Sequence, residues 1–102
     1  MIIFNTTYHV EEQILDEFLN YLKTEFVPAA IESQELKAPR MTRVLSQEQT
    51  NGHSFALQFE INELDGLDDW YNQTGEALNE EMISRFGEKV VGFSTLMEVV
   101  EL

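Results

Sequence analysis

The stretch that decides the fold is Ile2-Ile3-Phe4-Asn5-Thr6-Thr7-Tyr8-His9-Val10, near the start of the chain. Successive side chains of a β-strand point to opposite faces, so a strand here places large apolar residues on one face. The opposite face mixes apolar and polar side chains. The first face therefore requires a hydrophobic core, whereas the second can meet water, a partner or a ligand. The apolar face carries Ile2, Phe4, Tyr8 and Val10, and the mixed face carries Ile3, Asn5, Thr7 and His9.

Length and composition limit the architecture. The chain has 102 residues, which suits one domain and is too short for two, so we expect a single domain over residues 1–102. Hydrophobic residues make up 43% and charged residues 25%, as in a folded domain rather than a disordered chain. The sequence has no cysteine, which excludes disulfides, thiolate metal sites and thiol nucleophiles.

The charge of the chain narrows the choice of partners. The formal net charge is −13, from 19 acidic and 6 basic residues. Phosphate backbones and anionic lipids both attract clustered Lys and Arg, so we expect neither nucleic acid nor a membrane as a partner. No signal peptide is visible, and no stretch approaches the roughly 18 apolar residues of a membrane span. These features predict a cytoplasmic protein.

After Val10 the apolar period changes from two to 3.6 residues, which predicts a helix from about Glu11 to Glu25. Pro28 disfavours the helical conformation at Val27, so we expect a kink or a restart there. A second short helical turn is then expected from Ala29 to Glu35.

A β-hairpin is predicted in the middle of the chain. Two strands, Arg40–Glu48 and Ser54–Ile61, flank the turn signal Thr50-Asn51-Gly52. Pro39 suits an edge strand, because proline has no N–H to donate to a neighbouring strand. The second strand alternates clearly between apolar and polar residues. The pattern does not decide which face of Arg40–Glu48 points away from the helices.

Apolar residues spaced three or four apart predict a second helix, Leu64–Phe86, which Gly75 could break into two segments. A last alternating strand spans Val90–Val100. The order strand, helix, strand, strand, helix, strand predicts the α+β class. It matches a ferredoxin-like βαββαβ sandwich, in which two helices cover one face of a four-stranded antiparallel sheet. The strand Ile2–Val10 is central in that sheet.

The uncovered face of the sheet is too polar for a sealed core and too apolar to be left entirely to water. We expect it to carry Asn5, Thr7 and His9 from the first strand, Gln58 from the third and Ser94 from the last. Two such sheets usually pack face to face in this fold, which predicts a homodimer of the dimeric α/β-barrel type with a lumen lined by polar residues. The alternatives are a monomer with a solvated sheet and a dimer formed through the helices.

Few residues carry a chemical signal. His9 could act as a general base near neutral pH or simply be an interface histidine, whereas His53 is expected to be plain surface. Arg43 could hold a carboxylate or enolate oxygen of a ligand, or form an interface salt bridge. Trp70, with the neighbouring Tyr71, could line a pocket between helix and sheet or pack in the core. No ligand spacing, phosphate loop or nucleophile elbow is present, so we expect no metal and no cofactor.

Three segments carry a family resemblance: Met1-Ile2-Ile3-Phe4-Asn5, Met41-Thr42-Arg43-Val44-Leu45, and the run from Arg85 to Val100. Together they resemble an uncharacterised family of short single-domain proteins known only as a domain of unknown function. The resemblance spans essentially the whole chain and implies no catalytic residue. At the level of fold, the pattern is similar to the dimeric α/β barrels, which include cofactor-free oxygenases, isomerases and haem-handling enzymes. Such an analogy does not fix function.

Three functional hypotheses follow. The leading one is a homodimer that binds a small molecule, or regulates a partner, through its open sheet face. The second is a cofactor-independent oxygenase or isomerase, with His9 as base and with Asn5 and Arg43 as orienting groups. The third is a structural interaction module with a dry interface. The sequence does not specify a ligand or a reaction.

Overall fold

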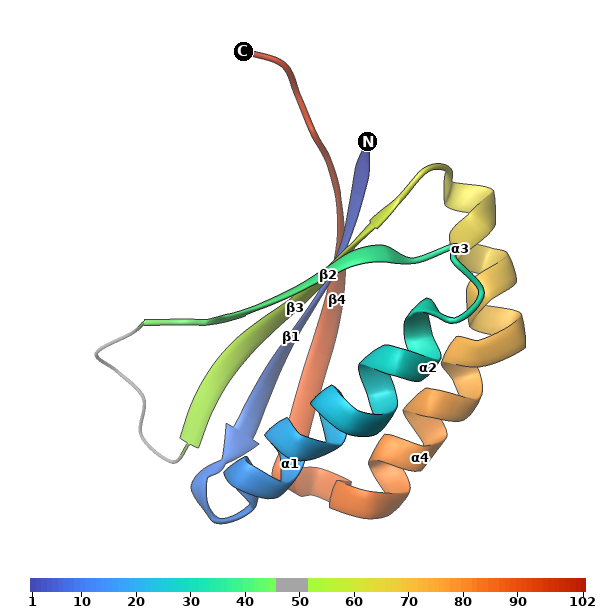
Figure 1. Cartoon of the computed structure of the whole chain (residues 1–102). Helices are drawn as coiled ribbons and strands as arrows, with labels where there is room; N and C mark the ends of the chain where they lie inside the picture. The colour runs from blue at the N-terminus through green and yellow to red at the C-terminus, as the bar shows by residue number, and fades with distance from the viewer. Residues whose placement is uncertain (46–51) are drawn as a thin grey trace.

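The computed structural model describes residues 1–45 and 52–102. It confirms the ferredoxin-like α+β architecture (Figure 1), in which a twisted sheet has a layer of helices on one face and is open on the other. The strands are Ile2–Glu11 (β1), Lys37–Arg43 (β2), Gly52–Ile61 (β3) and Val90–Glu98 (β4).

The sheet has the order β2-β3-β1-β4. Strand β1 pairs antiparallel with both β3 and β4, so it is central as predicted. Strand β2 is an edge, which confirms the expectation from Pro39. Its pairing with β3 shifts between Lys37 and Arg40, and Ala38 there has a φ of 51°. The predicted strand Arg40–Glu48 therefore begins earlier, while its end and the turn residues Thr50 and Asn51 lie outside the described residues.

The first helical stretch does not break before Pro28. It comprises a 3₁₀ turn Glu12–Ile14, helix α1 (Leu15–Tyr21), a π-helical turn Leu22–Phe26 and helix α2 (Val27–Ile31). Val27 is helical, with φ −63° and ψ −46°, and its N–H bonds to the carbonyl of Leu22. A π-helical turn widens the backbone by one residue, which gives the proline ring the room that a regular α-helix denies it.

The second helical stretch also continues through its suspected break. Helix α3 (Leu64–Trp70) passes through a π-helical turn, Tyr71–Gly75, into helix α4 (Glu76–Phe86). Gly75 is itself helical, with φ −65° and ψ −38°. Its role is close packing, since a Cβ at this position would lie 2.4 Å from Cζ3 of Trp70. The glycine lets the indole ring lie directly against the helix backbone.

Aromatic packing and one hydrogen bond join the helices to each other and to the sheet. Phe18 of α1 meets Tyr8 of β1 and Phe86 of α4 edge-on, with ring centroids 5.4 Å apart in both pairs. Trp70 Nε1 donates a 2.8 Å hydrogen bond to the carbonyl of Ala30, which ties α3 to α2. These contacts hold the two helical stretches against the same face of the sheet.

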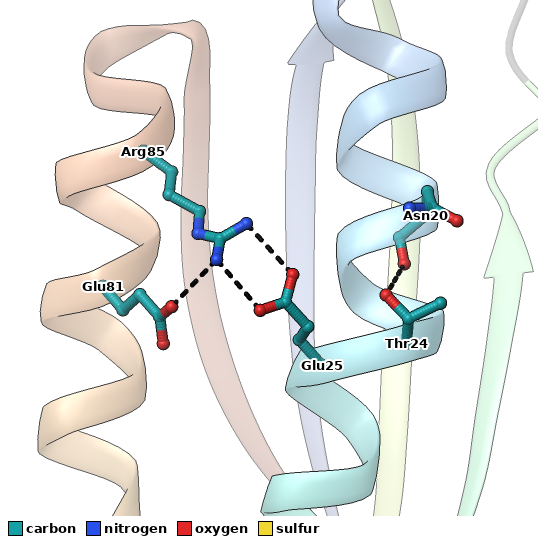
Figure 2. A network of polar contacts seen from close by, with 5 residues as sticks. All are labelled: Asn20, Thr24, Glu25, Glu81 and Arg85. Atoms are coloured by element: carbon teal, nitrogen blue, oxygen red, sulfur yellow. Dashed lines mark hydrogen bonds and ion pairs between the residues drawn. The ribbon is translucent and has the colours of Figure 1, made fainter.

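An exposed ion pair also spans the two helical stretches. The guanidinium of Arg85 on α4 donates two hydrogen bonds, of 2.9 and 3.0 Å, to the carboxylate of Glu25 (Figure 2). It also contacts Glu81 at 3.2 Å and lies over the ring of Tyr21. Because water screens these charges, the ion pairs contribute little to stability.

The register assigns each edge strand's side chains to a face, because directly paired residues share one. In β2, Met41 and Arg43 pair with Leu57 and Phe55 and face the helices, whereas Arg40 and Thr42 face the open side. This resolves the ambiguity that the sequence left for the second strand.

In β4 the register contradicts the expectation that Ser94 lies on the open face of the sheet. Ser94 pairs with Thr6, so it faces the helices and does not join Asn5 on the open face. Phe93 and its alternate neighbours face the open side instead. The pattern misled because β4 is an edge strand whose residues are accessible on both faces: Phe93 is 66% exposed and Leu96, on the helix side, is 48% exposed.

Replacing Gly75 by alanine tests the packing of Trp70. We expect Gly75→Ala to lower the free energy of unfolding by about 1–3 kcal/mol, because the methyl group would overlap the indole ring. Gly66→Ala is the matched control. Gly66 also lies in the second helical stretch, but a Cβ added there would meet only Oε2 of Glu35, at 3.9 Å, so alanine there should be neutral or should stabilise by up to about 1 kcal/mol. Urea unfolding measures both, and equal effects would contradict this role of Gly75.

Candidate functional site

A cavity of about 440 Å³ lies between the sheet and the second helical stretch. It exists because the side of β4 that faces the helices carries the small residues Gly92 and Ser94. A Cβ at Gly92 would lie 2.9 Å from Cδ1 of Tyr8, so the glycine also gives the tyrosine ring its place. The side chains around the cavity include Phe4, Thr6 and Tyr8 of β1, Phe59 of β3, and Trp70, Tyr71, Asn79 and Met82 of the second helical stretch.

The polar groups of the cavity are uncharged. Thr6 Oγ1 and Ser94 Oγ are 3.0 Å apart, and either hydroxyl can donate to the other. The side chain of Tyr8 is hydrogen-bonded to that of Thr6, and Asn79 contributes an amide from α4. None of the residues that line the cavity in the described part of the chain is Asp, Glu, Lys, Arg or His. The site therefore offers hydrogen bonds without charge.

Burial raises the pKa of the Tyr8 phenol to about 12, and the hydrogen bond with Thr6 opposes this shift. A phenol with such a pKa is fully protonated at neutral pH. Tyr8 can therefore donate a hydrogen bond to a ligand or to Thr6, but it is poorly suited to accept a proton as a general base.

Trp70 lies between the core and the cavity. It is buried in the core, its ring lies 6.0 Å from that of Phe4 in an edge-on arrangement, and it also lines the cavity. Tyr71, the neighbouring residue, lines the same cavity and is 46% exposed, so it lies toward the solvent side.

The open face of the sheet carries the other predicted polar residues. Asn5, Thr7, His9 and Gln58 lie there, with Gln58 directly opposite Asn5. Asn5 Nδ2 donates to Thr7 Oγ1 at 3.1 Å, and His9 Nδ1 is 3.2 Å from the Ser54 hydroxyl. His9 and Asn5 are separated by four residues of extended strand, or about 13 Å, so they do not form a compact pair.

Asn5 has an unusual environment for a residue on an open face. It is only 8% exposed, and its Oδ1 atom is buried without a hydrogen-bond partner in the described residues. Leaving a buried carbonyl oxygen unpaired costs about 1–3 kcal/mol. A donor brought to this face by a partner or ligand would recover that cost.

Arg43 is not part of this group. It faces the helices, where its Nη2 lies 2.6 Å from His53 Nδ1 and its cation lies 5.5 Å from the Phe55 ring centre. His53 Nε2 in turn lies 3.3 Å from a carboxylate oxygen of Glu12. The structure therefore does not bring Arg43 together with His9 and Asn5, and it places His53 in contact with two charged residues.

Sequence reasoning missed the cavity, although one signal pointed to it. Thr6 is the only polar residue between Ile2 and Val10 on the face that we assigned to the core. A hydroxyl in the middle of an apolar strand face requires a hydrogen-bond partner, which here is Ser94. Asn79 gave no such signal, because polar residues are common on exposed helix faces.

Two features are absent from the residues that the structure describes. Residues 1–45 and 52–102 contain no group of three or more His, Cys, Asp or Glu side chains placed to hold a metal ion. In the same residues, no helix has both the length and the apolar character that crossing a bilayer requires.

Comparison with known families gives a clear assignment. The profile of DUF4286, a domain of unknown function, matches residues 1–100. The chain belongs to the DUF4286 family. This confirms the resemblance to an uncharacterised family of short single-domain proteins. A comparison with curated proteins finds no match.

Solved structures share the fold of this DUF4286 protein at low sequence identity. A Deinococcus radiodurans protein assigned by name to the antibiotic biosynthesis monooxygenases has a TM-score of 0.74 and 14% identity, covering 100% of this chain and 95% of its own. Another protein named antibiotic biosynthesis monooxygenase has a TM-score of 0.69 and 19% identity, covering 99% and 100%. A dimeric ferredoxin-like protein of unknown function from Thermobifida fusca has a TM-score of 0.63 and 15% identity, covering 97% and 92%. These likenesses establish the fold alone.

The pKa of Tyr8 predicts how stability depends on alkaline pH. The folded-state pKa of about 12 lies above the ordinary tyrosine value of 10.0, so the folded protein holds this proton more tightly than the unfolded chain. The resulting stability is fully present below pH 10 and is lost as pH rises toward 12. We expect Tyr8→Phe to reduce this loss by about 2–3 kcal/mol, measured by urea unfolding between pH 9 and 12. An unchanged pH dependence would contradict the raised pKa.

Proposed function

We propose that this DUF4286 protein binds a neutral, largely apolar small molecule in the cavity between β4 and the helices α3 and α4. The uncharged lining is the observation that supports this most strongly, because the chain as a whole is 25% charged with a net charge of −13. A charged ligand would lose its hydration there without meeting an opposite charge. A neutral, apolar ligand gains from burial and loses little.

The hydroxyl groups favour a ligand with at least one polar group. Thr6 and Ser94 are bonded to each other, so each can turn a lone pair or its hydrogen toward a third group. A hydroxyl or carbonyl group of the ligand would satisfy this pair. The aromatic side chains Phe4, Trp70 and Tyr71 would contact the apolar part.

A cofactor-independent oxygenase or isomerase is the second candidate. It is supported by the fold that the chain shares with proteins named monooxygenases, although fold alone does not imply activity. Against it, the lining offers no group that is basic at neutral pH, since the pKa of the Tyr8 phenol is about 12. Binding without chemistry therefore has the better support. The cavity likewise supports binding over a purely structural module.

Two probes that differ in charge test the ligand class. We expect 2-naphthol to bind and 2-naphthoate to bind at least about tenfold more weakly at pH 7. The carboxylate would lose its hydration in the cavity without meeting a positive charge. Isothermal titration calorimetry measures both affinities. Equal affinities, or preference for the carboxylate, would contradict a neutral ligand.

Two variants of neighbouring residues in β4 test whether 2-naphthol binds in the cavity. Ser94→Leu should abolish binding of 2-naphthol by filling the cavity beside Thr6. Thr95→Val replaces the neighbouring residue of β4, whose side chain faces the open side opposite Asn5, and should leave the affinity unchanged. If both variants bind equally well, the probe occupies another site.

We further propose that the protein is a cytoplasmic homodimer that associates through the open face of the sheet. The register assigns to this face Phe93 and Val91, which are 66% and 62% exposed, together with Met97. It is therefore more apolar than the sequence predicted. The buried, unpaired Oδ1 of Asn5 lies on the same face and could accept a hydrogen bond from the second copy.

The distribution of charge also favours the open sheet face as the dimer interface. The register places two acids, Glu11 and Glu60, and two bases, Lys37 and Arg40, on it. Most of the 19 acidic residues lie elsewhere, many of them on the helices. Two copies that met through their helices would oppose negative surfaces, whereas two sheet faces would not. The structural neighbour from Thermobifida fusca is itself described as dimeric.

Light scattering coupled to size exclusion tests the interface. Phe93→Asp should convert the dimer to a monomer, because it places a charge in the centre of an apolar contact. Leu64→Asp is the control, since Leu64 is 54% exposed at the start of α3 and should tolerate the change. A dimer that survives Phe93→Asp would place the interface on another surface.

A further inference from the structure

Three of the six basic residues of this acidic chain line two adjoining hollows beside β2. The hollows, of about 410 and 310 Å³, meet at Pro39 and lie between β2 and the first helical stretch. Their basic residues are Lys23, Lys37 and Arg40, and no Asp or Glu of the described chain lines either hollow. The two hollows together, the β2 trough, are therefore basic in a chain whose net charge is −13.

The basic side chains of the β2 trough have no counter-charge. Within residues 1–45 and 52–102, Lys23, Lys37 and Arg40 form no ion pair, whereas Arg85 is held by two glutamates. Neighbouring cations without partners raise the local electrostatic potential. An anionic group would therefore be attracted to the trough, although the chain as a whole would repel it.

The lining of the trough between these cations is apolar. Leu19, Leu22 and Val27 form the wall that belongs to the first helical stretch. Met41 and Leu57 form the wall that belongs to the sheet, and Met41 is 38% exposed. Apolar side chains that carry acidic neighbours would match both properties of the trough.

The outer edge of β2 offers backbone hydrogen bonds beside the trough. β2 is a terminal strand of the sheet, and the N–H of Val44 bonds to the carbonyl of Ser54 in β3. In an antiparallel pair, the backbone groups of every second residue point to the same neighbour. The N–H and C=O groups of Met41 and Arg43 therefore point outward, away from β3. An extended segment could pair with them.

The edge strands of a second copy do not match the trough. Two β2 strands side by side would bring like charges together, because each carries Lys37, Arg40 and Arg43. Strand β4 carries one acidic residue, Glu98, so it could neutralise only one of the bases. The charge of the trough therefore favours a segment of a different protein.

We propose that the β2 trough binds an extended peptide segment of a partner protein in which apolar and acidic residues alternate. The segment adds to the outer edge of β2 and pairs with the backbone of Met41 and Arg43. Its apolar side chains face the helices, as Met41 does, and lie in the trough. Its acidic side chains take the opposite face, on which Arg40 and Lys37 lie. Lys23, on the helical wall, raises the potential of the same region.

This site is separate from the proposed ligand cavity and does not require the homodimer. The cavity lies between β4 and the helices α3 and α4, and β4 is at the edge of the sheet opposite to β2. Phe93, in the proposed dimer interface, is also on β4. Peptide binding can therefore be measured and can fail independently of both.

A labelled peptide tests the chemistry of the partner. The probe is fluorescein-labelled Glu-Val-Glu-Val-Glu-Val-Glu, and the control peptide has glutamine in place of every glutamate. We expect fluorescence anisotropy at low ionic strength to show at least about tenfold tighter binding of the acidic peptide. Because a net charge of −13 repels this peptide, such a preference requires a local group of bases. Equal affinities, or no binding of either peptide, would overturn the proposal.

Two N-methylated forms of the acidic peptide test strand addition. In an extended segment the valine N–H groups point to one edge and the glutamate N–H groups to the other. Methylation of one set should abolish binding, and methylation of the other should leave it nearly unchanged, because only one set faces β2. If both methylated peptides bind equally, the segment does not add to β2 and the proposal is wrong.

Charge variants of the protein locate the bound peptide. Lys23→Glu and Arg40→Glu should each raise the dissociation constant of the acidic peptide at least about fivefold. Lys89→Glu makes the same change in net charge outside the trough and should alter the constant by less than about twofold. Equal effects of all three variants would show that the peptide binds elsewhere.

A pair of variants at Met41 tests the backbone contact. Met41→Pro removes an outward N–H without removing a hydrogen bond to β3, so it should abolish binding of the acidic peptide. Met41→Val keeps the N–H and an apolar side chain and should retain binding. If both variants bind equally well, the edge of β2 is not used. The charge variants replace exposed side chains, so they test the site even if Met41→Pro fails to fold.

Discussion

The two-sided pairing of β1 is the constraint on which the rest of this structure depends. Because β1 bonds to both β3 and β4 in a fixed register, each of its side chains determines which neighbours share its face. Thr6 therefore meets Ser94 in the cavity, while Thr7 meets Phe93 on the open side. A shift of one residue in either pairing would exchange the cavity lining with the sheet surface.

Charged residues are unevenly distributed over this protein. The acidic residues lie largely on the helices, whereas the cavity is uncharged and the open sheet face has balanced charges. This distribution makes helical surfaces repel one another and leaves the sheet face as a place where two copies could approach. Ligand binding and association would thus use opposite faces of one sheet.

The two π-helical turns have different local causes but a similar structural effect. In the first helical stretch the turn precedes Pro28, and in the second it ends at Gly75, on which Trp70 packs. Each turn allows the helix to continue past a residue that usually ends one. Sequence propensity predicted a kink or a restart at Pro28 and left a break at Gly75 open, because propensity describes a regular α-helix and not a helix that gains stability from packing against a sheet.

The sequence by itself determined the order of elements, the ferredoxin-like class, the central position of β1 and the polar open face formed by Asn5, Thr7 and His9. These follow from local periodicity, which depends only on neighbouring residues. The tertiary structure alone decided the faces of the edge strands, the position of Arg43 beside His53 and the cavity below Trp70. Edge strands are accessible on both sides, so their side chains are not sorted by polarity, and only the register with β1 and β3 can assign them.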